Sequence, residues 1–168
     1  MPEVTAAEKQ VSDVLQALGI AFTRHEHPPV FTVEEADRYW RDIPATHCKN
    51  LFLRNAKGNR HYLVVLEASR TANLKDLATR IGDDRLSFAS AERLQRFLGL
   101  TPGSVSPFGL IHPGAKDVLV VLDADLARVD RLGFHPNVNT VTITLAAADF
   151  LRFLDSRGNI VRRVSFTE

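Results

Sequence analysis

Two apolar runs on either side of a short polar turn place the strongest constraint on how this chain folds. The runs are CKNLFLRN and HYLVVLEA, and the turn between them, AKGNR, contains a glycine. Apolar runs separated by such a turn predict a β-hairpin. Residues 51–53, LFL, are large and apolar in succession, which is typical of a strand that is buried on both faces.

Helical segments with recognisable start signals interrupt the strands. Thr5 with Glu8, and Thr32 with Glu35, have the spacing of a capping box, in which the two side chains satisfy each other's backbone N–H groups. Two further helices are expected to begin after Asn73 and Ser90 and to end at Gly82 and Gly99, and apolar residues predict a last helix around 147–154. Each helix has an apolar stripe suited to packing on a sheet.

Four more segments are expected to be strands: residues 20–27, 117–123, 140–145 and, at the end, 159–166. In TVTITL, residues 140–145, valine, isoleucine and leucine alternate strictly with threonine, so the two sets face opposite ways. Strands and helices are mixed without the regular alternation of a doubly wound nucleotide fold. We therefore predict a single α/β domain over residues 1–168, built on a largely antiparallel sheet.

Composition and charge exclude several classes of function. Lysine and arginine number 21 against 20 aspartate and glutamate, so the chain lacks the basic excess typical of duplex binding, and no specific DNA binding is expected. A protein that grips only the end of a nucleic acid is still allowed. No run approaches the roughly 20 apolar residues that span a bilayer. The N-terminus lacks the features of a signal peptide, and there is a single cysteine. These features predict a cytoplasmic protein.

Familiar catalytic signatures are missing from the sequence. There is no phosphate-binding loop, G-x-G-x-x-G turn, H-E-x-x-H, C-x-x-C or nucleophile elbow. His25 and His27 stand two apart on an expected strand, but no third ligand matches them, so neither a metal nor a cofactor is predicted. Cys48 has His47 and Lys49 as neighbours, yet neighbours on a strand point to opposite faces. A small buried apolar residue is the favoured interpretation of Cys48.

Three polar clusters remain as candidates for a site. They are Lys49-Asn50 at the start of a buried strand, the loop GSVSPFG at 103–109, and GFHPNVNT at 133–140. In the last cluster Asn139 shares the parity of Val141 and Ile143, and a polar residue on an apolar face needs a partner or lines a cavity. Each cluster alone has a structural explanation. Together, at the ends of neighbouring strands, they are expected to surround one pocket.

Four motifs in this order, HEHPPVFTVEEA, CKNLFLRN, GSVSPFGL and GFHPNVNTVTI, resemble the YbaK/ProX superfamily of aminoacyl-tRNA editing domains. Within it, the chain is similar to the freestanding alanyl-tRNA(Pro) deacylases of the ProXp-ala (PrdX-type) group. The resemblance runs nearly end to end. It implies a mixed sheet that is partly curled into a barrel, with flanking helices, as in the insertion domain of prolyl-tRNA synthetases.

The resemblance also implies a function and site residues. The expected activity is hydrolysis of the ester in alanyl-tRNA(Pro), with steric exclusion of proline and help from the ribose 2′-hydroxyl. Cysteinyl-tRNA(Pro) as the substrate and a noncatalytic RNA-binding protein are the alternatives. The expected partner is the 3′ acceptor end of tRNA(Pro), with prolyl-tRNA synthetase or an elongation factor as protein partners. The implied catalytic residues are Lys49, Asn50, Gly103 and His135, and the implied substrate-binding residues are Val30, Phe31, Ser104, Val105, Ser106, Pro107, Phe134 and Asn139.

Overall fold

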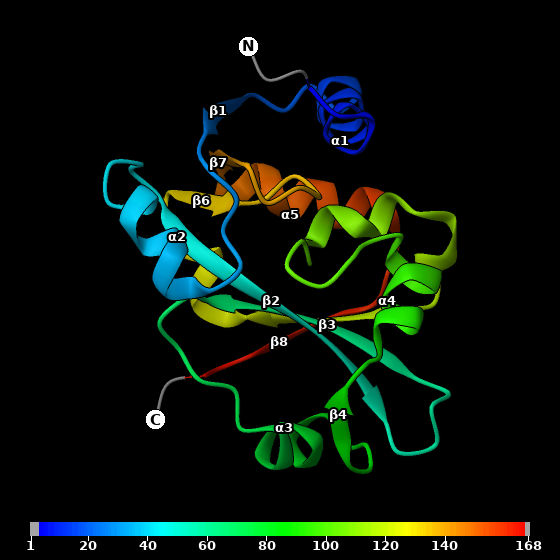
Figure 1. Cartoon of the computed structure of the whole chain (residues 1–168). Helices are drawn as coiled ribbons and strands as arrows, with labels where there is room; N and C mark the ends of the chain where they lie inside the picture. The colour runs from blue at the N-terminus through cyan, green and yellow to red at the C-terminus, as the bar shows by residue number, and fades with distance from the viewer. Residues whose placement is uncertain (1–3, 167–168) are drawn as a thin grey trace.

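The computed structural model describes residues 4–166. Eight strands form one curled sheet in the order β1-β7-β6-β2-β3-β5-β8, with β4 paired to β2 (Figure 1). The strands are β1 Phe22–Glu26, β2 Thr46–Asn55, β3 His61–Glu67, β4 Leu86–Phe88, β5 Leu119–Asp123, β6 Arg131–Phe134, β7 Val141–Ala146 and β8 Val161–Val164. The α-helices are α1 Ala6–Ala17, α2 Val33–Trp40, α3 Leu74–Ile81, α4 Ala91–Leu98 and α5 Ala147–Arg157.

The prediction of an α/β fold on a curled, mainly antiparallel sheet is confirmed. The pairs β1–β7, β2–β3, β2–β4 and β6–β7 are antiparallel, whereas β2–β6, β3–β5 and β5–β8 are parallel. The short strands β4 and β6 were not predicted, because three or four residues show too little periodicity. The proline-rich segment after α4 contains two 3-10 helices, Pro107–Ile111 and Pro113–Ala115, and a third, Ala124–Ala127, follows β5.

The hairpin is the centre of the molecule because apolar layers cover both of its faces. Leu63 and Val65 of β3 belong to the main core, which α1, α4 and α5 cover. Val64 and Leu66 point the other way, into a second cluster under α3. The uninterrupted apolar run in β3 therefore reflects burial on both sides. None of the helices within residues 4–166 is long and apolar enough to cross a membrane.

The four predicted helix starts are confirmed, but the capping boxes close only in part. The hydroxyls of Thr5 and Thr32 each accept from the backbone N–H three residues on, at 3.1 Å. The carboxylate of Glu8 is buried and pairs with Arg24 of β1 rather than with the N–H of Thr5. A buried carboxylate needs a charged partner more than a helix start needs a second acceptor. This ion pair ties α1 to the edge of the sheet.

The strict alternation predicted for β7 does not correspond to one buried and one exposed face. Thr142 is fully buried and Thr144 is 3 % exposed. Both hydroxyls have partners, since Thr142 lies 2.8 Å from the ring of His27 and Thr144 accepts from Arg131 at 3.0 Å. The threonine face of β7 is therefore a buried polar layer and not a solvated surface.

One strand, β2, connects the two halves of the sheet. Its first residues, Thr46 and His47, pair with β6, and its last three pair with β4. Between them, β2 keeps only β3 as a neighbouring strand, and its other edge opens. This opening carries the polar residues Lys49 and Asn50.

Candidate functional site

A small cavity of about 210 Å³ lies where β2 separates from β6. Five parts of the chain contribute to it: the segment before α2, α2 itself, the early part of β2 and the two loops that follow α4 and β6. The lining residues are Val30, Phe31, Thr32, Ala36, Trp40, Cys48, Lys49, Asn50, Gly103, Val105 and His135.

The structure brings together all three polar clusters that the sequence singled out. Each cluster contributes at least one lining residue to this cavity, as does the HPPVF segment. The expected site residues that line it are Lys49, Asn50, Gly103, His135, Val30, Phe31 and Val105. These positions are up to 105 residues apart in the chain, from Val30 to His135.

Five expected site residues do not line the cavity. Ser106 is fully buried, and its hydroxyl caps the 3-10 helix by accepting from Phe108 N at 3.1 Å. Pro107 opens that same helix, and Phe134 packs in the core against Phe108 and Phe150. These three residues are buried next to residues that line the cavity, and they do not reach the cavity themselves. Ser104 is half-buried, and its N–H closes the loop on Thr101 O at 3.1 Å.

Asn139 holds the neighbouring segment in place, so it finds a partner, which is one of the two outcomes expected for it. It precedes β7, and its side-chain amide donates to Val30 O at 3.1 Å while its carbonyl accepts from Val30 N at 3.2 Å. The two hydrogen bonds clamp the HPPVF segment against the start of β7. Asn139 therefore acts on the cavity through Val30.

Asn50 presents an unpaired acceptor. Its Oδ1 atom is buried and has no hydrogen-bond partner within the described residues. A buried acceptor without a partner costs about 1–3 kcal/mol, so such atoms are rare in folded proteins. Because Asn50 lines the cavity, a ligand with an N–H or O–H donor can satisfy this oxygen.

Lys49 and Cys48 differ in their capacity for chemistry. Lys49 is half-buried at the cavity and forms no ion pair within residues 4–166, so its charge is available to an anionic ligand. Cys48 is 5 % exposed, and burial raises the pKa of its thiol well above the usual value. A thiol held in its protonated form is a poor nucleophile. The interpretation of Cys48 as an apolar residue agrees with this environment.

His135 offers one free ring nitrogen to the cavity. Its Nδ1 lies 2.9 Å from Val141 O, so Nδ1 carries the proton and Nε2 is left as an acceptor. Burial lowers the pKa of His135, with further lowering from His27 and His47, so the ring is neutral near pH 7. His27 packs edge-on against it at 5.6 Å between ring centroids. The ring orientation is therefore held by both a hydrogen bond and packing.

The loop at Gly103 supplies backbone donors. Gly103 has a φ of +90°, which favours glycine, and a Cβ built on it would lie 3.1 Å from Phe31 Cδ1. The N–H groups of Gly103 and Val105 have no acceptor within the described residues. Phe31 is 68 % exposed and lies across this loop at the cavity mouth.

Sequence reasoning missed one wall of the cavity. Thr32, Ala36 and Trp40 line it from α2 and its cap, and they stand four residues apart. That spacing puts them on one helical face, which was the available signal. The helix was recognised, but its partner surface was not. No group of three histidine, cysteine, aspartate or glutamate side chains that suits a metal ion occurs in residues 4–166, and His25 and His27 have no third ligand there.

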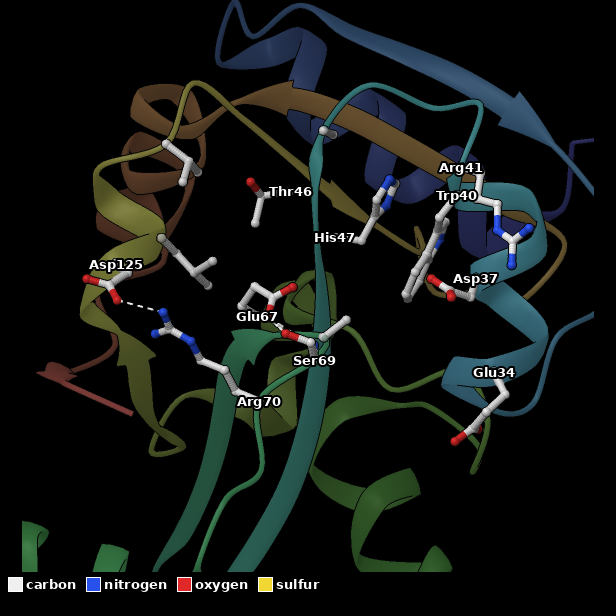
Figure 2. Close-up of a pocket in the computed structure, with 14 residues that line it drawn as sticks. Glu34, Asp37, Trp40, Arg41, Thr46, His47, Glu67, Ser69, Arg70 and Asp125 are labelled. Carbon is white, nitrogen blue, oxygen red and sulfur yellow. Dashed lines mark hydrogen bonds and ion pairs between the residues drawn. The ribbon is translucent and has the colours of Figure 1, made fainter. Parts of the chain in front are cut away.

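A larger cavity of about 610 Å³ lies on the other side of Trp40 (Figure 2). Trp40 lines both cavities, and its indole stacks on His47 at 4.7 Å between ring centroids. Carboxylates surround this second space, and its Arg70 already pairs with Asp125 at 2.8 Å. The larger cavity also has buried atoms that are unpaired within the described residues, His47 Nδ1 and Trp40 Nε1, but none of the predicted site residues lines it. The smaller cavity, which gathers all three polar clusters, is the better candidate site.

These features define a class of protein: a curled-sheet domain with a small, partly apolar pocket that has a cation at its edge and donors and acceptors for a polar ligand. A family model described as "Aminoacyl-tRNA editing domain" matches residues 27–153, which includes every residue that lines the pocket. The chain belongs to this family. The expected membership of the YbaK/ProX superfamily is thereby confirmed, while its alanine-specific branch stays a prediction.

Two relatives whose names state a function support the same grouping. The prolyl-tRNA editing protein ProX of Acetoanaerobium sticklandii is 40 % identical over 158 residues, which cover 94 % of this chain and 96 % of that protein. The multifunctional Ser/Thr-tRNA deacylase ProXp-y of Escherichia coli K12 is 34 % identical over 94 residues, 56 % of this chain and 54 % of that protein. These names agree with the expectation of an aminoacyl-tRNA hydrolase.

A solved structure shows the same fold. It is described as "Crystal structure of a putative trans-editing enzyme for prolyl tRNA synthetase" and has a TM-score of 0.73, with 97 % of this chain and 99 % of that chain covered. Its sequence identity is 19 %, so the likeness concerns the fold alone.

Proposed function

We propose that this protein is a trans-editing deacylase that hydrolyses the ester of alanyl-tRNA(Pro) in the cytoplasm. The observation that carries the proposal is the pocket at the opening of β2, which combines a small volume with unpaired polar groups. At about 210 Å³ it is smaller than the roughly 300–1,000 Å³ typical of drug-sized ligand sites. A small aminoacyl group suits this size.

The editing problem is a matter of side-chain size. A synthetase pocket shaped for proline cannot strongly reject alanine, because one methylene is worth only about 1–3 kcal/mol. A second pocket that accepts a methyl group and excludes the pyrrolidine ring completes a double sieve. Val30, Ala36 and Trp40 are apolar lining residues that suit steric selection.

The polar residues receive roles from their geometry. Lys49 neutralises the phosphate or ribose region of the terminal nucleotide and so positions the ester. The free N–H groups of Gly103 and Val105 stabilise the negative charge that develops on the carbonyl oxygen. Asn50 Oδ1 accepts a hydrogen bond from the α-ammonium group of the substrate, which provides the partner that this buried oxygen lacks.

Hydrolysis proceeds without a protein nucleophile. Water attacks the carbonyl carbon, the bond to the ribose oxygen breaks, and that oxygen takes up a proton. We assign help in this step to the neighbouring 2′-hydroxyl. The neutral His135 accepts a hydrogen bond at Nε2 from this hydroxyl or from the water. The thiol of Cys48, with its raised pKa, has no part in the reaction.

The test is a comparison of alanyl-, cysteinyl-, seryl- and prolyl-tRNA(Pro) as substrates, followed by loss of the aminoacyl ester. We expect fast hydrolysis of the alanyl ester and survival of the prolyl ester. Preferential loss of the cysteinyl or seryl ester would move the specificity to that amino acid. Failure to hydrolyse any of the four would refute the proposal and favour a noncatalytic RNA-binding role.

Two further comparisons separate the parts of the mechanism. A substrate with a 2′-deoxy terminal adenosine is expected to react far more slowly, and a normal rate would exclude help from the 2′-hydroxyl. Adding prolyl-tRNA synthetase or elongation factor tests whether either is a partner, through a change in the rate at limiting alanyl-tRNA(Pro).

A further inference from the structure

Three arginines without acidic partners gather at the far end of the hairpin. They are Arg54 on β2 and Arg93 and Arg96 on α4, and we refer to them as the arginine cluster. Arg54 donates to the carbonyls of residues 55 and 56, and Arg93 donates to Gly58 O at 3.2 Å. None of the three forms an ion pair with a carboxylate within residues 4–166.

Two of these guanidinium groups converge on one point. A Cβ built on Gly58 would lie 3.0 Å from Nη2 of Arg93 and 3.1 Å from Nη2 of Arg54. Positive charges held this close repel one another unless an anion lies between or beside them. Arginine is also the side chain that pairs best with phosphate, because its planar fork can donate two parallel hydrogen bonds.

His61 lies among these arginines and adds no positive charge to them. Its Nε2 accepts from Arg93 at 2.9 Å. Burial is the largest cause, followed by the charges of Arg93, Arg96 and Arg54 in that order, and together they lower the pKa of His61 to about 4. The ring is therefore neutral at pH 7, and the local charge comes from the arginines alone.

Aromatic rings form a floor under the cluster. Arg96 lies over Phe97 at 4.7 Å from its centroid, and Phe97 contacts His61 at 4.0 Å between centroids. Phe97 is half-buried, so part of its ring is open to solvent. Guanidinium groups interleaved with partly exposed aromatic rings are typical of surfaces that bind single-stranded nucleic acid.

The cluster and the pocket lie on the same face of β2, with the buried Phe52 between them. Alternate residues of a strand share a face, so Asn50 at the pocket, Phe52 in the core and Arg54 point the same way. Arg54 lies four positions after Asn50 on the strand, which is about 13 Å at roughly 3.3 Å per residue. The helix α4 also links the two sites, because it carries Arg93 and Arg96 and leads into the loop that contains Gly103 (Figure 1).

We propose that the arginine cluster binds the sugar–phosphate backbone of the RNA whose 3′ end enters the pocket. This inference rests on the proposed function for the identity of the RNA. The pocket holds the aminoacyl ester, and the cluster holds phosphates farther along the acceptor strand. The net charge of the chain is only +1, but these three arginines gather positive charge at one place on the surface without a broad basic face.

Binding of an uncharged RNA tests the proposal separately from catalysis. The probe is a fluorescein-labelled acceptor-stem minihelix ending in CCA, measured by anisotropy over a range of salt concentrations. Arg96→Ala and Arg93→Ala are each expected to weaken binding about 3- to 10-fold and to lower the slope of log affinity against log salt by about 1. Arg96 is exposed, so its removal leaves the fold unaffected.

Arg163→Ala is the matched control, because Arg163 is an exposed arginine on the edge strand β8, which β3 and β5 separate from β2 in the sheet. It removes the same charge and is expected to leave the affinity unchanged. Equal losses in Arg163→Ala and Arg96→Ala would overturn the proposal, as would unchanged affinity in Arg96→Ala and Arg93→Ala. Reduced binding to anionic lipid vesicles without an effect on RNA would also overturn it, because it would assign the cluster to a membrane.

Hydrolysis assays then separate this inference from the proposed function. On alanyl minihelix, Arg96→Ala is expected to raise KM with little change in kcat, and on an alanyl-CCA trinucleotide the rise in KM should be smaller. Equal effects on both substrates would place Arg96 at the ester and contradict a remote backbone contact. If the wild-type protein hydrolyses neither substrate, the proposed function fails, while the anisotropy result still decides the role of the cluster.

Discussion

Replacing Asn50 with leucine is expected to make the protein more stable and less active. The buried Oδ1 atom of Asn50 has no partner, which costs about 1–3 kcal/mol, and leucine has a similar branched shape without polar atoms. The adjoining cavity of about 210 Å³ can take the added carbon volume. For a chain of 150 to 250 residues, 1 kcal/mol corresponds to about 2–4 °C in Tm, so we expect a rise of roughly 2–12 °C.

Activity should change in the opposite direction. If Oδ1 accepts from the α-ammonium group, its loss removes a hydrogen bond to a charged group, worth about 1.5–3 kcal/mol. Single-turnover deacylation of alanyl-tRNA(Pro) should therefore slow by about 10- to 100-fold. Thermal and urea unfolding of the same samples measure stability.

Asn55 provides the matched control on the same strand. Its Oδ1 accepts from the N–H groups of Asn59 and Arg60, each at 3.1 Å, and its Nδ2 donates to Asn59 at 2.7 Å and to Asp83 at 3.3 Å. Asn55→Leu removes all four bonds, so it should destabilise the fold by about 2–4 kcal/mol. If Asn50→Leu also lowered Tm, or kept the wild-type rate, the idea of an acceptor reserved for substrate would be wrong.

Three other perturbations have expected outcomes. Lys49→Ala should lower kcat/KM by about 100-fold or more, because it removes the charge that positions the substrate. The Tm should stay within about 2 °C of the wild-type value, because a half-buried lysine contributes little packing. Near-normal rates would contradict the positioning role. Gly103→Ala and Gly19→Ala should each lower the free energy of unfolding by about 1–2 kcal/mol, since both glycines have a positive φ. Only Gly103→Ala should also slow deacylation, because a Cβ at Gly19 meets nothing within 4 Å. By NMR titration His61 should protonate near pH 4. Because this pKa lies below the unfolded value of about 6.5, the free energy of unfolding should fall as the pH decreases from 6.5 toward 4. A free energy of unfolding that does not change over this range would contradict the buried, arginine-lined environment of His61.

Much of the fold could be predicted because its signals are local. The hydroxyls of Thr5 and Ser90 and the amide of Asn73 cap the helices that follow them, as their positions indicated. The hairpin followed from two apolar runs and a glycine turn. The same reasoning went wrong where a distant partner competed, as when Glu8 paired with Arg24 instead of closing its capping box.

The sequence could predict which motifs form the site, but not which of their residues line the cavity. Motif resemblance named Lys49, Asn50, Gly103 and His135, and the structure gathers them at one cavity. The same motifs also contain Ser106 and Phe134, which are buried behind the walls. Neighbouring residues of one motif match the family equally well. Only the path of the backbone decides which side chain points to the cavity and which to the core.

By itself, the sequence determined where the helices and the longer strands lie, which segments are apolar, and which motifs belong to an editing domain. These properties depend on residues within a few positions of each other, so they can be inferred without a structure. Only the tertiary structure decided that α2 closes the pocket through Trp40, that Asn50 carries an unpaired oxygen, and that Arg54 meets Arg93 over Gly58. The physical reason is that each of these depends on the register and curl of the sheet, which bring together atoms from distant parts of the chain.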